Sequence, residues 1–279
     1  MLRLGALSAA IAGVLIFGGP ATAGSLKDRP AYSWSGAYVG IHGGYGWGDH
    51  DGTLTVEATD PDTHFPPSAQ RSYELDGGFG GGQIGLNFQH ESLVFGIEAD
   101  ISYADIDGAV SGTTHTFGTW GSYTKDITTE IEWLGTLRGR LGIDVGPALI
   151  YGTGGLAWAK TDGEQVTFFN GGLVPPQQGG GGAAGLHAVS SDNKWLTGWT
   201  VGGGVEWALS KNWSLKGEYL YVDLGNAEYH YVGTKTGVGG GAPGDAHTTD
   251  GFKGDLDLQT VKIGLNYKFG GREAPVPLK

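Results

Sequence analysis

The stretch Val261-Lys262-Ile263-Gly264-Leu265-Asn266-Tyr267-Lys268-Phe269 places an apolar or aromatic residue at every odd position and a polar residue or glycine at every even one. A period of two residues is typical of a β-strand with one apolar face. The same alternation recurs about eight times along the chain, with aromatic residues near the ends of many runs. This repetition predicts an all-β fold, an eight-stranded antiparallel up-and-down transmembrane β-barrel.

The N-terminus carries the pattern of an export signal. Arg3 supplies a positive charge, residues 4–17 form an apolar run, and Ala21-Thr22-Ala23 matches a small-residue cleavage site. We therefore expect a cleaved signal peptide at residues 1–23, the barrel at 24–269 and a short periplasmic tail at 270–279. No later window reaches the roughly 18 consecutive apolar residues of a membrane helix, so any membrane span must consist of strands.

The composition narrows the classes of partner. The chain has 55 glycines, no cysteine and a formal net charge of −12. Because this excess of negative charge repels phosphate backbones, we expect no nucleic-acid partner. The absence of cysteine excludes disulfides, a thiolate nucleophile and a lipoprotein anchor.

The alternation predicts eight strands joined by connections of two kinds. The predicted strands cover residues 36–47, 80–89, 93–103, 131–142, 149–160, 195–209, 213–223 and 261–269. Three connections are tight turns, and four are long and rich in Gly, Pro, Asp and Thr, at residues 48–76, 105–129, 161–194 and 224–255. Short periplasmic turns and long extracellular loops are typical of outer membrane barrels.

Aromatic residues gather at both ends of the predicted strands. One rim would hold Trp47, Tyr103, Trp133, Trp158, Trp199 and Tyr221, and the other Phe88, Trp207, Trp213 and Phe269. Aromatic side chains are enriched at the two membrane–water interfaces of transmembrane barrels. The pattern therefore predicts two interfacial girdles.

Charged residues occupy the face opposite the apolar one: Glu98, Asp100, Glu132, Arg138, Arg140, Glu206, Lys216, Glu218 and Lys262. Because Lys or Arg against hydrocarbon near the bilayer midplane costs about 2–4 kcal/mol, these residues are predicted to line the barrel interior. An eight-stranded interior is only just wide enough for its own side chains, which favours a mutually neutralising network over a conducting channel. We nominate no catalytic residue, because the arginines beside the carboxylates Glu98 and Asp100 disfavour a general acid.

The histidines give no metal signature. All eight are scattered, and no pair stands at metal-ligand spacing. We therefore expect no metal site and no cofactor, with a haem or metal site assembled from loop histidines kept as an alternative.

The turn Ser210-Lys211-Asn212 predicts the register of one hairpin. Centring the two strands on Lys211 sets Trp207 opposite Leu215 on the lipid face and Glu206 opposite Lys216 in the interior. We expect the second pair to form a cross-strand ion pair.

Several segments resemble a known family. They are Trp34-Ser35-Gly36-Ala37-Tyr38-Val39-Gly40, Phe95-Gly96-Ile97-Glu98-Ala99-Asp100, Trp133-Leu134-Gly135-Thr136-Leu137-Arg138-Gly139-Arg140-Leu141-Gly142 and Tyr151-Gly152-Thr153-Gly154-Gly155-Leu156-Ala157. With the signal peptide, they resemble the alphaproteobacterial outer-membrane immunogenic or porin-family proteins. The resemblance implies an OmpA-like barrel in a Gram-negative outer membrane, inserted through a C-terminal aromatic signal at Tyr267 and Phe269. This chain departs from that pattern because residues 270–279 follow the signal.

These observations lead to a non-enzymatic function. We expect a structural role in envelope integrity and the display of surface loops, with outer-membrane lipid, lipopolysaccharide and the barrel-assembly machinery as partners. The alternatives are a narrow nonspecific pore for small hydrophilic solutes and a loop-mediated adhesin or haem binder, whose partner would be a host surface or haem. A soluble lipocalin-like carrier is disfavoured, because that fold would place apolar residues inside.

Overall fold

A computed structural model describes residues 32–57, 68–116, 121–171, 187–234 and 247–269. The predicted signal peptide at residues 1–23 and the predicted tail at 270–279 lie outside these ranges. Within the described ranges, no helix is long and apolar enough to cross a membrane.

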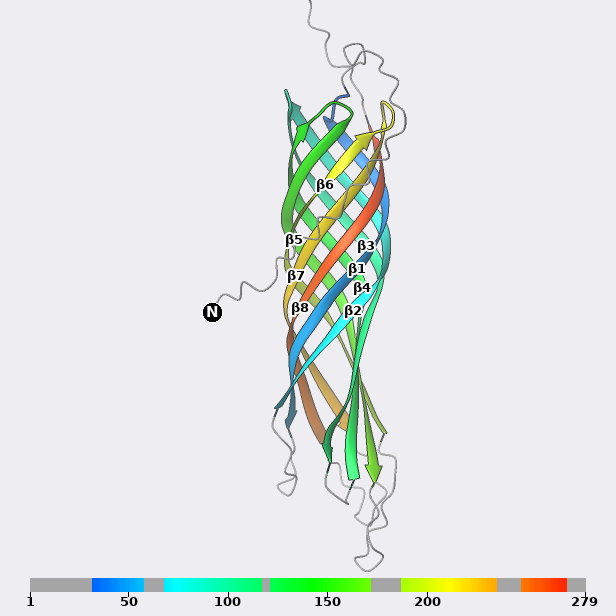
Figure 1. The fold of residues 1–279 in the computed structure, drawn as a ribbon, viewed down its shortest axis with the longest axis vertical. Coiled ribbons are helices and arrows are strands. Elements are labelled where there is room, and N and C mark those ends of the chain that lie inside the picture. The colour runs from blue at the N-terminus through cyan, green and yellow to red at the C-terminus, as the bar shows by residue number, and fades with distance from the viewer. Residues whose placement is uncertain (1–31, 58–67, 117–120, 172–186, 235–246, 270–279) are drawn as a thin grey trace, which may run out of the picture. The chain divides into compact units, whose positions relative to one another are not determined.

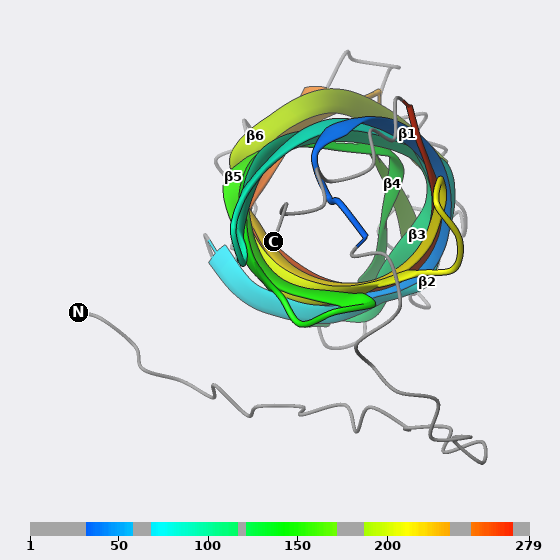
Figure 2. The ribbon, with the colours of Figure 1, turned by 90° about the horizontal axis from the view of Figure 1, so that it is seen from above.

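Eight antiparallel strands close into a barrel in chain order, as the sequence predicts (Figure 1). The strands are β1 (Gly36–Glu57), β2 (Ser68–His90), β3 (Leu93–Thr116), β4 (Gly121–Asp144), β5 (Ala148–Gly171), β6 (His187–Ala208), β7 (Trp213–Thr234) and β8 (His247–Lys268). The first and last strands pair from Tyr38↔Lys268 to Glu57↔Thr249, which closes the ring seen along the barrel axis in Figure 2. Closure leaves no sheet edge in the lipid, where an unpaired backbone group would be costly.

The strands are about twice as long as the sequence pattern indicates. Each has 22 to 24 residues, whereas about 9–11 residues suffice to cross a bilayer. The strands continue into much of the sequence predicted as loops. Residues 48–57 of β1 and 68–76 of β2 are examples, since β1 and β2 pair with each other there. The loop prediction was wrong there because frequent Gly, Asp and Thr were taken as turn signals. On a strand outside the bilayer, such residues simply face water.

Strand β8 shows that the barrel has two halves of opposite polarity. Its inward residues run Phe252, Leu256, Leu258, then Thr260, Lys262, Asn266 and Lys268. Its outward residues run Lys253, Asp255, Asp257, Gln259, then Val261, Ile263, Leu265 and Tyr267. From residue 260 to the end of β8 the outside is apolar and the inside polar, and from 252 to 259 the reverse holds.

We call the part with the apolar outside the membrane half and the part with the polar outside the outer half. The membrane half lies at the end of the short turns, and the outer half at the end of the longer connections. In outer membrane barrels the long connections face the exterior, so the outer half projects from the bilayer into water. Its interior is a continuous apolar core with members from seven strands, among them Leu75, Ile106, Ile131, Leu196, Val222 and Leu258.

One histidine is enclosed in the core of the outer half. The His50 ring is fully buried, with its centroid 4.8 Å from that of Phe252 and 5.2 Å from that of Tyr73. The Tyr73 hydroxyl lies 2.8 Å from Nδ1 of His50 and 2.5 Å from the Thr129 hydroxyl. Burial lowers the pKa of His50 to about 4, a shift that the neighbouring Asp51 opposes. The core therefore holds a neutral imidazole at ordinary pH.

The polarity inversion predicts opposite responses to a lysine at two outward positions of β8. Ile263→Lys, at a side chain that is 67% exposed on the apolar face, should destabilise the barrel in lipid vesicles by about 2–4 kcal/mol. Gln259→Lys, four residues further along the same face, should cost less than about 1 kcal/mol because it lies at the interface. Urea unfolding in vesicles measures both. Equal losses would contradict the assigned membrane level.

The buried imidazole predicts a pH response confined to the outer half. Because the pKa of His50 is lowered from 6.5 to about 4 on folding, the unfolded state takes up the proton first as the pH falls. The stability held by the neutral ring is complete above pH 6.5 and is lost progressively between pH 6.5 and 4. Hydrogen exchange in the outer half should rise over this window beyond its intrinsic pH dependence, and His50→Phe should remove the excess. An unchanged excess in the variant would mean that another group titrates.

Candidate functional site

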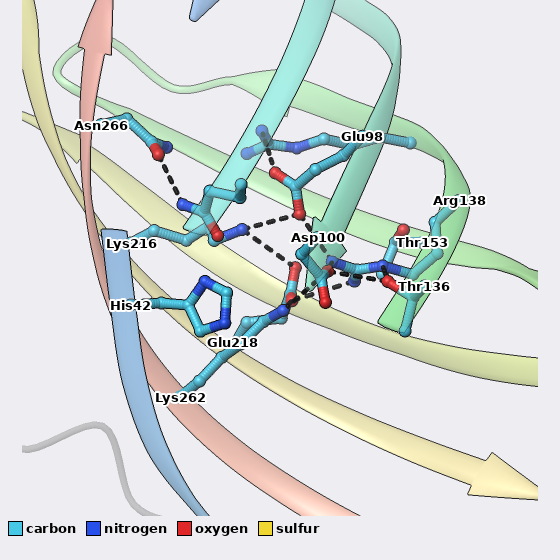
Figure 3. A network of polar contacts seen from close by, with 12 residues as sticks. His42, Glu98, Asp100, Thr136, Arg138, Thr153, Lys216, Glu218, Lys262 and Asn266 are labelled. Carbon is cyan, nitrogen blue, oxygen red and sulfur yellow. Dashed lines mark hydrogen bonds and ion pairs between the residues drawn. The ribbon is translucent and has the colours of Figure 1, made fainter. Parts of the chain in front are cut away.

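Eight charged side chains meet inside the membrane half. Four are carboxylates and four are cations: Glu98, Asp100, Glu206, Glu218, Arg138, Arg140, Lys216 and Lys262. Each residue is at most 7% exposed. Because the charges balance and each has an opposite partner within 3.1 Å, the cluster avoids the large cost of an isolated buried charge. Figure 3 shows six of the eight side chains pointing toward one another: Glu98, Asp100, Glu218, Arg138, Lys216 and Lys262. We call these eight residues the lumen network.

Glu98 on β3 is a centre of the network. It accepts hydrogen bonds from Arg138 at 2.6 Å, from the Lys216 ammonium at 2.7 Å and from the Tyr38 hydroxyl at 2.6 Å. These donors come from β4, β7 and β1, so one carboxylate links strands around the ring. Gly85 on β2 leaves room for the phenol, since a Cβ there would lie 2.3 Å from the Tyr38 ring.

A second pair of carboxylates shares its cations. Asp100 lies 2.8 Å from Arg138 and 3.0 Å from Lys262, and Glu218 lies 2.9 Å and 3.1 Å from the same two groups. The Tyr151 hydroxyl also donates to Glu218 at 2.8 Å. Removing either cation would therefore leave two carboxylates short of a partner.

The fourth carboxylate is held at the level of the short turns. Glu206 pairs with Arg140 and accepts hydrogen bonds from Ser214 at 2.5 Å and from Asn266 at 2.8 Å. The Arg140 guanidinium lies 3.7 Å from the centre of the Tyr151 ring, a cation–π contact.

The register predicted for the β6–β7 hairpin is confirmed, but the ion pair predicted from it is wrong. Glu206 stands opposite Lys216 and Trp207 opposite Leu215. The carboxylates that pair with Lys216 are Glu98 and Glu218, not Glu206. Glu206 instead bonds Arg140, which reaches it from β4. In a narrow lumen, a side chain from another strand can lie closer than the cross-strand neighbour.

Glu132 does not join the lumen network, contrary to the sequence prediction. The β4–β5 register shifts between Ile131 and Trp133, so Ile131 is buried inside while Glu132 and Trp133 face outward. Glu132 pairs with Lys160 at 2.5 Å on the outer surface. A β-bulge reverses the facing of all residues beyond it, which a strict two-residue period cannot anticipate.

Two further layers fill the lumen, one on each side of the network. At the end of the short turns, the segment before β1 turns into the barrel (Figure 2). Its Trp34 side chain is buried against Val94 and Leu149. The Trp34 backbone N–H donates to Gln89 at 2.7 Å, and the Lys268 ammonium bonds the carbonyl of Ser33. On the opposite side of the network lies the apolar core of the outer half.

The predicted aromatic residues lie on the outer face at both ends of the membrane half. At the end next to the outer half, the ring centroids of Tyr103 and Trp133 are 5.6 Å apart, and those of Trp199 and Tyr221 are also 5.6 Å apart. Trp47 and Trp158 are half-buried at the same end. At the end of the short turns, Phe88 stacks on Phe95 and Trp207 is half exposed. Trp213, Tyr267 and Phe269 form a chain of edge contacts at the same end.

Sequence reasoning missed several polar residues that complete the network. They are Tyr38, His42, Gln83, Tyr151, Ser214 and Asn266, of which Gln83 donates to Asn266 at 2.5 Å and His42 lies 2.7 Å from the Ser102 hydroxyl. All occupy inward positions of the same alternation, so the facing was readable, but the contacts across the lumen were not.

The carboxylates of the network are all engaged by cations. Each network carboxylate is held by at least one cation, which disfavours a general acid. Among the described residues, no three His, Asp or Glu side chains are grouped to hold a metal ion.

The network contacts predict a selective coupling between charges. In a double-mutant cycle of unfolding in vesicles, Glu98→Gln and Lys216→Met should show a coupling energy above about 1 kcal/mol, because each single variant leaves the other charge buried. The matched cycle of Glu206→Gln with Lys216→Met joins register neighbours that make no direct ion pair, and its coupling should stay below about 0.5 kcal/mol. A larger coupling in the second cycle would restore the local pairing.

Comparisons with known proteins agree with this architecture. The chain is 33% identical over 240 residues to the 31 kDa outer-membrane immunogenic protein of Brucella melitensis biotype 1, covering 85% of each chain. It is 28% identical over 251 residues to the 25 kDa outer-membrane immunogenic protein of Brucella abortus biovar 1, covering 90% of this chain and 86% of that protein.

One solved structure aligns over most of both chains at low identity. The outer membrane protein OprG from Pseudomonas aeruginosa aligns with a TM-score of 0.43 and 14% identity, over 84% of this chain and 96% of that one.

The family model for the outer membrane protein beta-barrel domain matches residues 9–269. The chain therefore belongs to the outer membrane protein β-barrel family and is an outer membrane protein.

Proposed function

We propose that this protein is a non-conducting outer membrane barrel that supports the envelope and carries a rigid surface outside the cell. The observation that carries the proposal is the filling of the lumen by three successive layers. They are the segment around Trp34, the lumen network and the apolar core of the outer half. A path for hydrated ions would have to displace all three.

The paired charges support a mechanical role for the network. Glu98 joins β3 to β1, β4 and β7 through charge-assisted hydrogen bonds, which are stronger than neutral ones. Such links resist the separation of strands under lateral pressure from the bilayer. We therefore propose that the network serves to hold the barrel closed rather than to select a solute.

The outer surface supports the proposed contacts with the envelope. The apolar belt between the two aromatic girdles would contact lipid and the acyl chains of lipopolysaccharide, and we propose that the barrel-assembly machinery recognises the Tyr267–Phe269 end of β8. We further propose that the protein is not an enzyme. The relatives compared carry no enzymatic name, and the network carboxylates are engaged in ion pairs.

Single-channel recording tests the proposal directly. The refolded protein in planar bilayers should give no conductance steps, and Trp34→Ala should also remain silent because the network and the apolar core stay in place. Insertion is verified independently by protease protection in vesicles of the same composition. Stable conductance steps from verified wild-type barrels would overturn the proposal in favour of the narrow pore.

A further inference from the structure

The ladder between β6 and β7 stops partway along the barrel. It ends at Trp199↔Asp223, whereas β6 includes residues 187–198 and β7 includes residues 224–234. On their other sides both strands remain paired over these ranges, β6 with β5 and β7 with β8. Within the described part of the chain, two strand edges therefore face each other in the outer half without a ladder. We call this region the β6–β7 seam.

A bulge in β7 explains where the seam begins. The β7–β8 register shifts between Asp223 and Asn226, and Gly225 between them has a φ of 68°. The Gly225 N–H donates to the Asp223 carboxylate at 2.8 Å, which fixes the turn of the chain. A bulge bends its strand, and this one follows directly after Asp223, the residue of β7 at which the ladder with β6 ends.

The seam differs from the other place where a ladder is short. Between β2 and β3 the pairs end at Asp76↔Asp107, yet a Cβ added at Gly108 would lie 2.3 Å from the Glu74 carbonyl oxygen. Those two strands remain in contact. At the seam, β6 and β7 are in contact where the ladder ends, since a Cβ added at Gly198 would lie 1.8 Å from the Asp223 carbonyl oxygen. Beyond that point the Lys194 side chain, and not a backbone ladder, joins β6 to Glu228.

A lysine side chain bridges the seam. The Lys194 ammonium on β6 donates to the backbone carbonyl of Glu228 on β7 and lies 5.8 Å from the Tyr229 ring centre. It also pairs with Asp192 at 3.4 Å. In a continuous sheet, a backbone N–H of β6 would donate to the Glu228 carbonyl. Here the Lys194 ammonium donates to it instead. The seam can therefore accept a donor that carries positive charge.

An acidic groove runs beside the edge of β6. Its lining residues come from β4, β5 and β6: Thr128, Glu130, Asp162, Gly163, Glu164, Asp192 and Asn193. Four of the seven lining residues are carboxylates. Asp192 and Asn193 belong to β6, the strand that borders the seam. The groove therefore spans β4 to β6 and reaches β6 at Asp192 and Asn193, in the same strand whose other side faces the seam.

We propose that the β6–β7 seam binds an extended peptide segment of a partner protein that carries lysine or arginine, by adding it as a strand to β6. An open strand edge is a template for main-chain hydrogen bonds, and residues 192–197 offer a length typical of a strand. The acidic groove selects positive side chains. A second copy of this chain is disfavoured as the occupant, because a net charge of −12 makes two copies repel. The inference goes beyond the structural role and is independent of conductance.

The first experiment separates strand addition from charge attraction. A fluorescent eight-residue peptide of alternating Lys and Val is titrated against the full-length mature protein in nanodiscs, followed by anisotropy. The same peptide with alternate backbone nitrogens methylated keeps every charge but loses one row of N–H donors. We expect saturable binding of the parent peptide and at least a tenfold weaker Kd for the methylated one. No binding, or equal Kd values, would overturn the proposal.

The second experiment locates the site at the seam through a matched pair of lysines. Lys194→Met removes the ammonium that donates across the seam, whereas Lys211→Met removes an exposed lysine of the short β6–β7 turn, at the opposite end of the barrel, with the same change in charge. We expect Lys194→Met to tighten peptide binding several-fold more than Lys211→Met. Equal changes would reduce the effect to net charge and contradict a seam site.

The third experiment closes the seam covalently. Because the chain has no cysteine, Thr197→Cys with Asn226→Cys introduces a single possible disulfide across the seam. The control, Asn226→Cys with Asp255→Cys, links register neighbours on β7 and β8. Oxidation should abolish peptide binding only in the first variant, with recovery on reduction. Binding that survives a verified seam disulfide would place the site elsewhere. Where the two cysteines stand too far apart for a direct bond, a bifunctional maleimide joins them instead, and binding that survives this cross-link would overturn the proposal in the same way.

Discussion

The barrel depends on one electrostatic constraint: charges on its strands cannot face hydrocarbon. Every second residue of a strand faces the same side, so the cost of a lysine or arginine in lipid fixes the phase of a whole strand. In the membrane half this constraint brings four carboxylates and four cations into a lumen barely wider than the side chains themselves. Once there, they are tolerated because each is paired at hydrogen-bond distance.

The same constraint reverses where the strands leave the bilayer. Water around the outer half accepts charge, so acidic residues such as Asp255 and Asp257 lie outside while Leu256 and Leu258 turn inward. The result is one continuous sheet that is a membrane barrel at one end and a water-soluble barrel at the other. Burying apolar side chains stabilises the outer half, and the neutral histidine His50 is retained within that core.

The two halves divide the tasks that we propose. The membrane half is closed by pairing around the whole ring, which suits a component that must resist the bilayer and remain impermeable. The outer half can leave part of its wall open, because water satisfies backbone groups that lipid would not. The β6–β7 seam begins immediately above the girdle formed by Trp199 and Tyr221, at the level where this freedom begins.

The sequence alone determined the strand number, the closure, the facing of the lumen charges and the register of the β6–β7 hairpin, because all four follow from a two-residue period and short turns. The reversed period of residues 252–259 was also readable, but frequent Gly, Asp and Thr led to a loop prediction. Only the tertiary structure decided which charges pair, since Lys216 reaches Glu98 rather than its neighbour Glu206. It also decided that the β4 bulge moves Glu132 to the surface and that the β6–β7 ladder ends beside the β7 bulge. Contacts across a lumen and bulges depend on the packing of distant strands, which a local pattern does not contain.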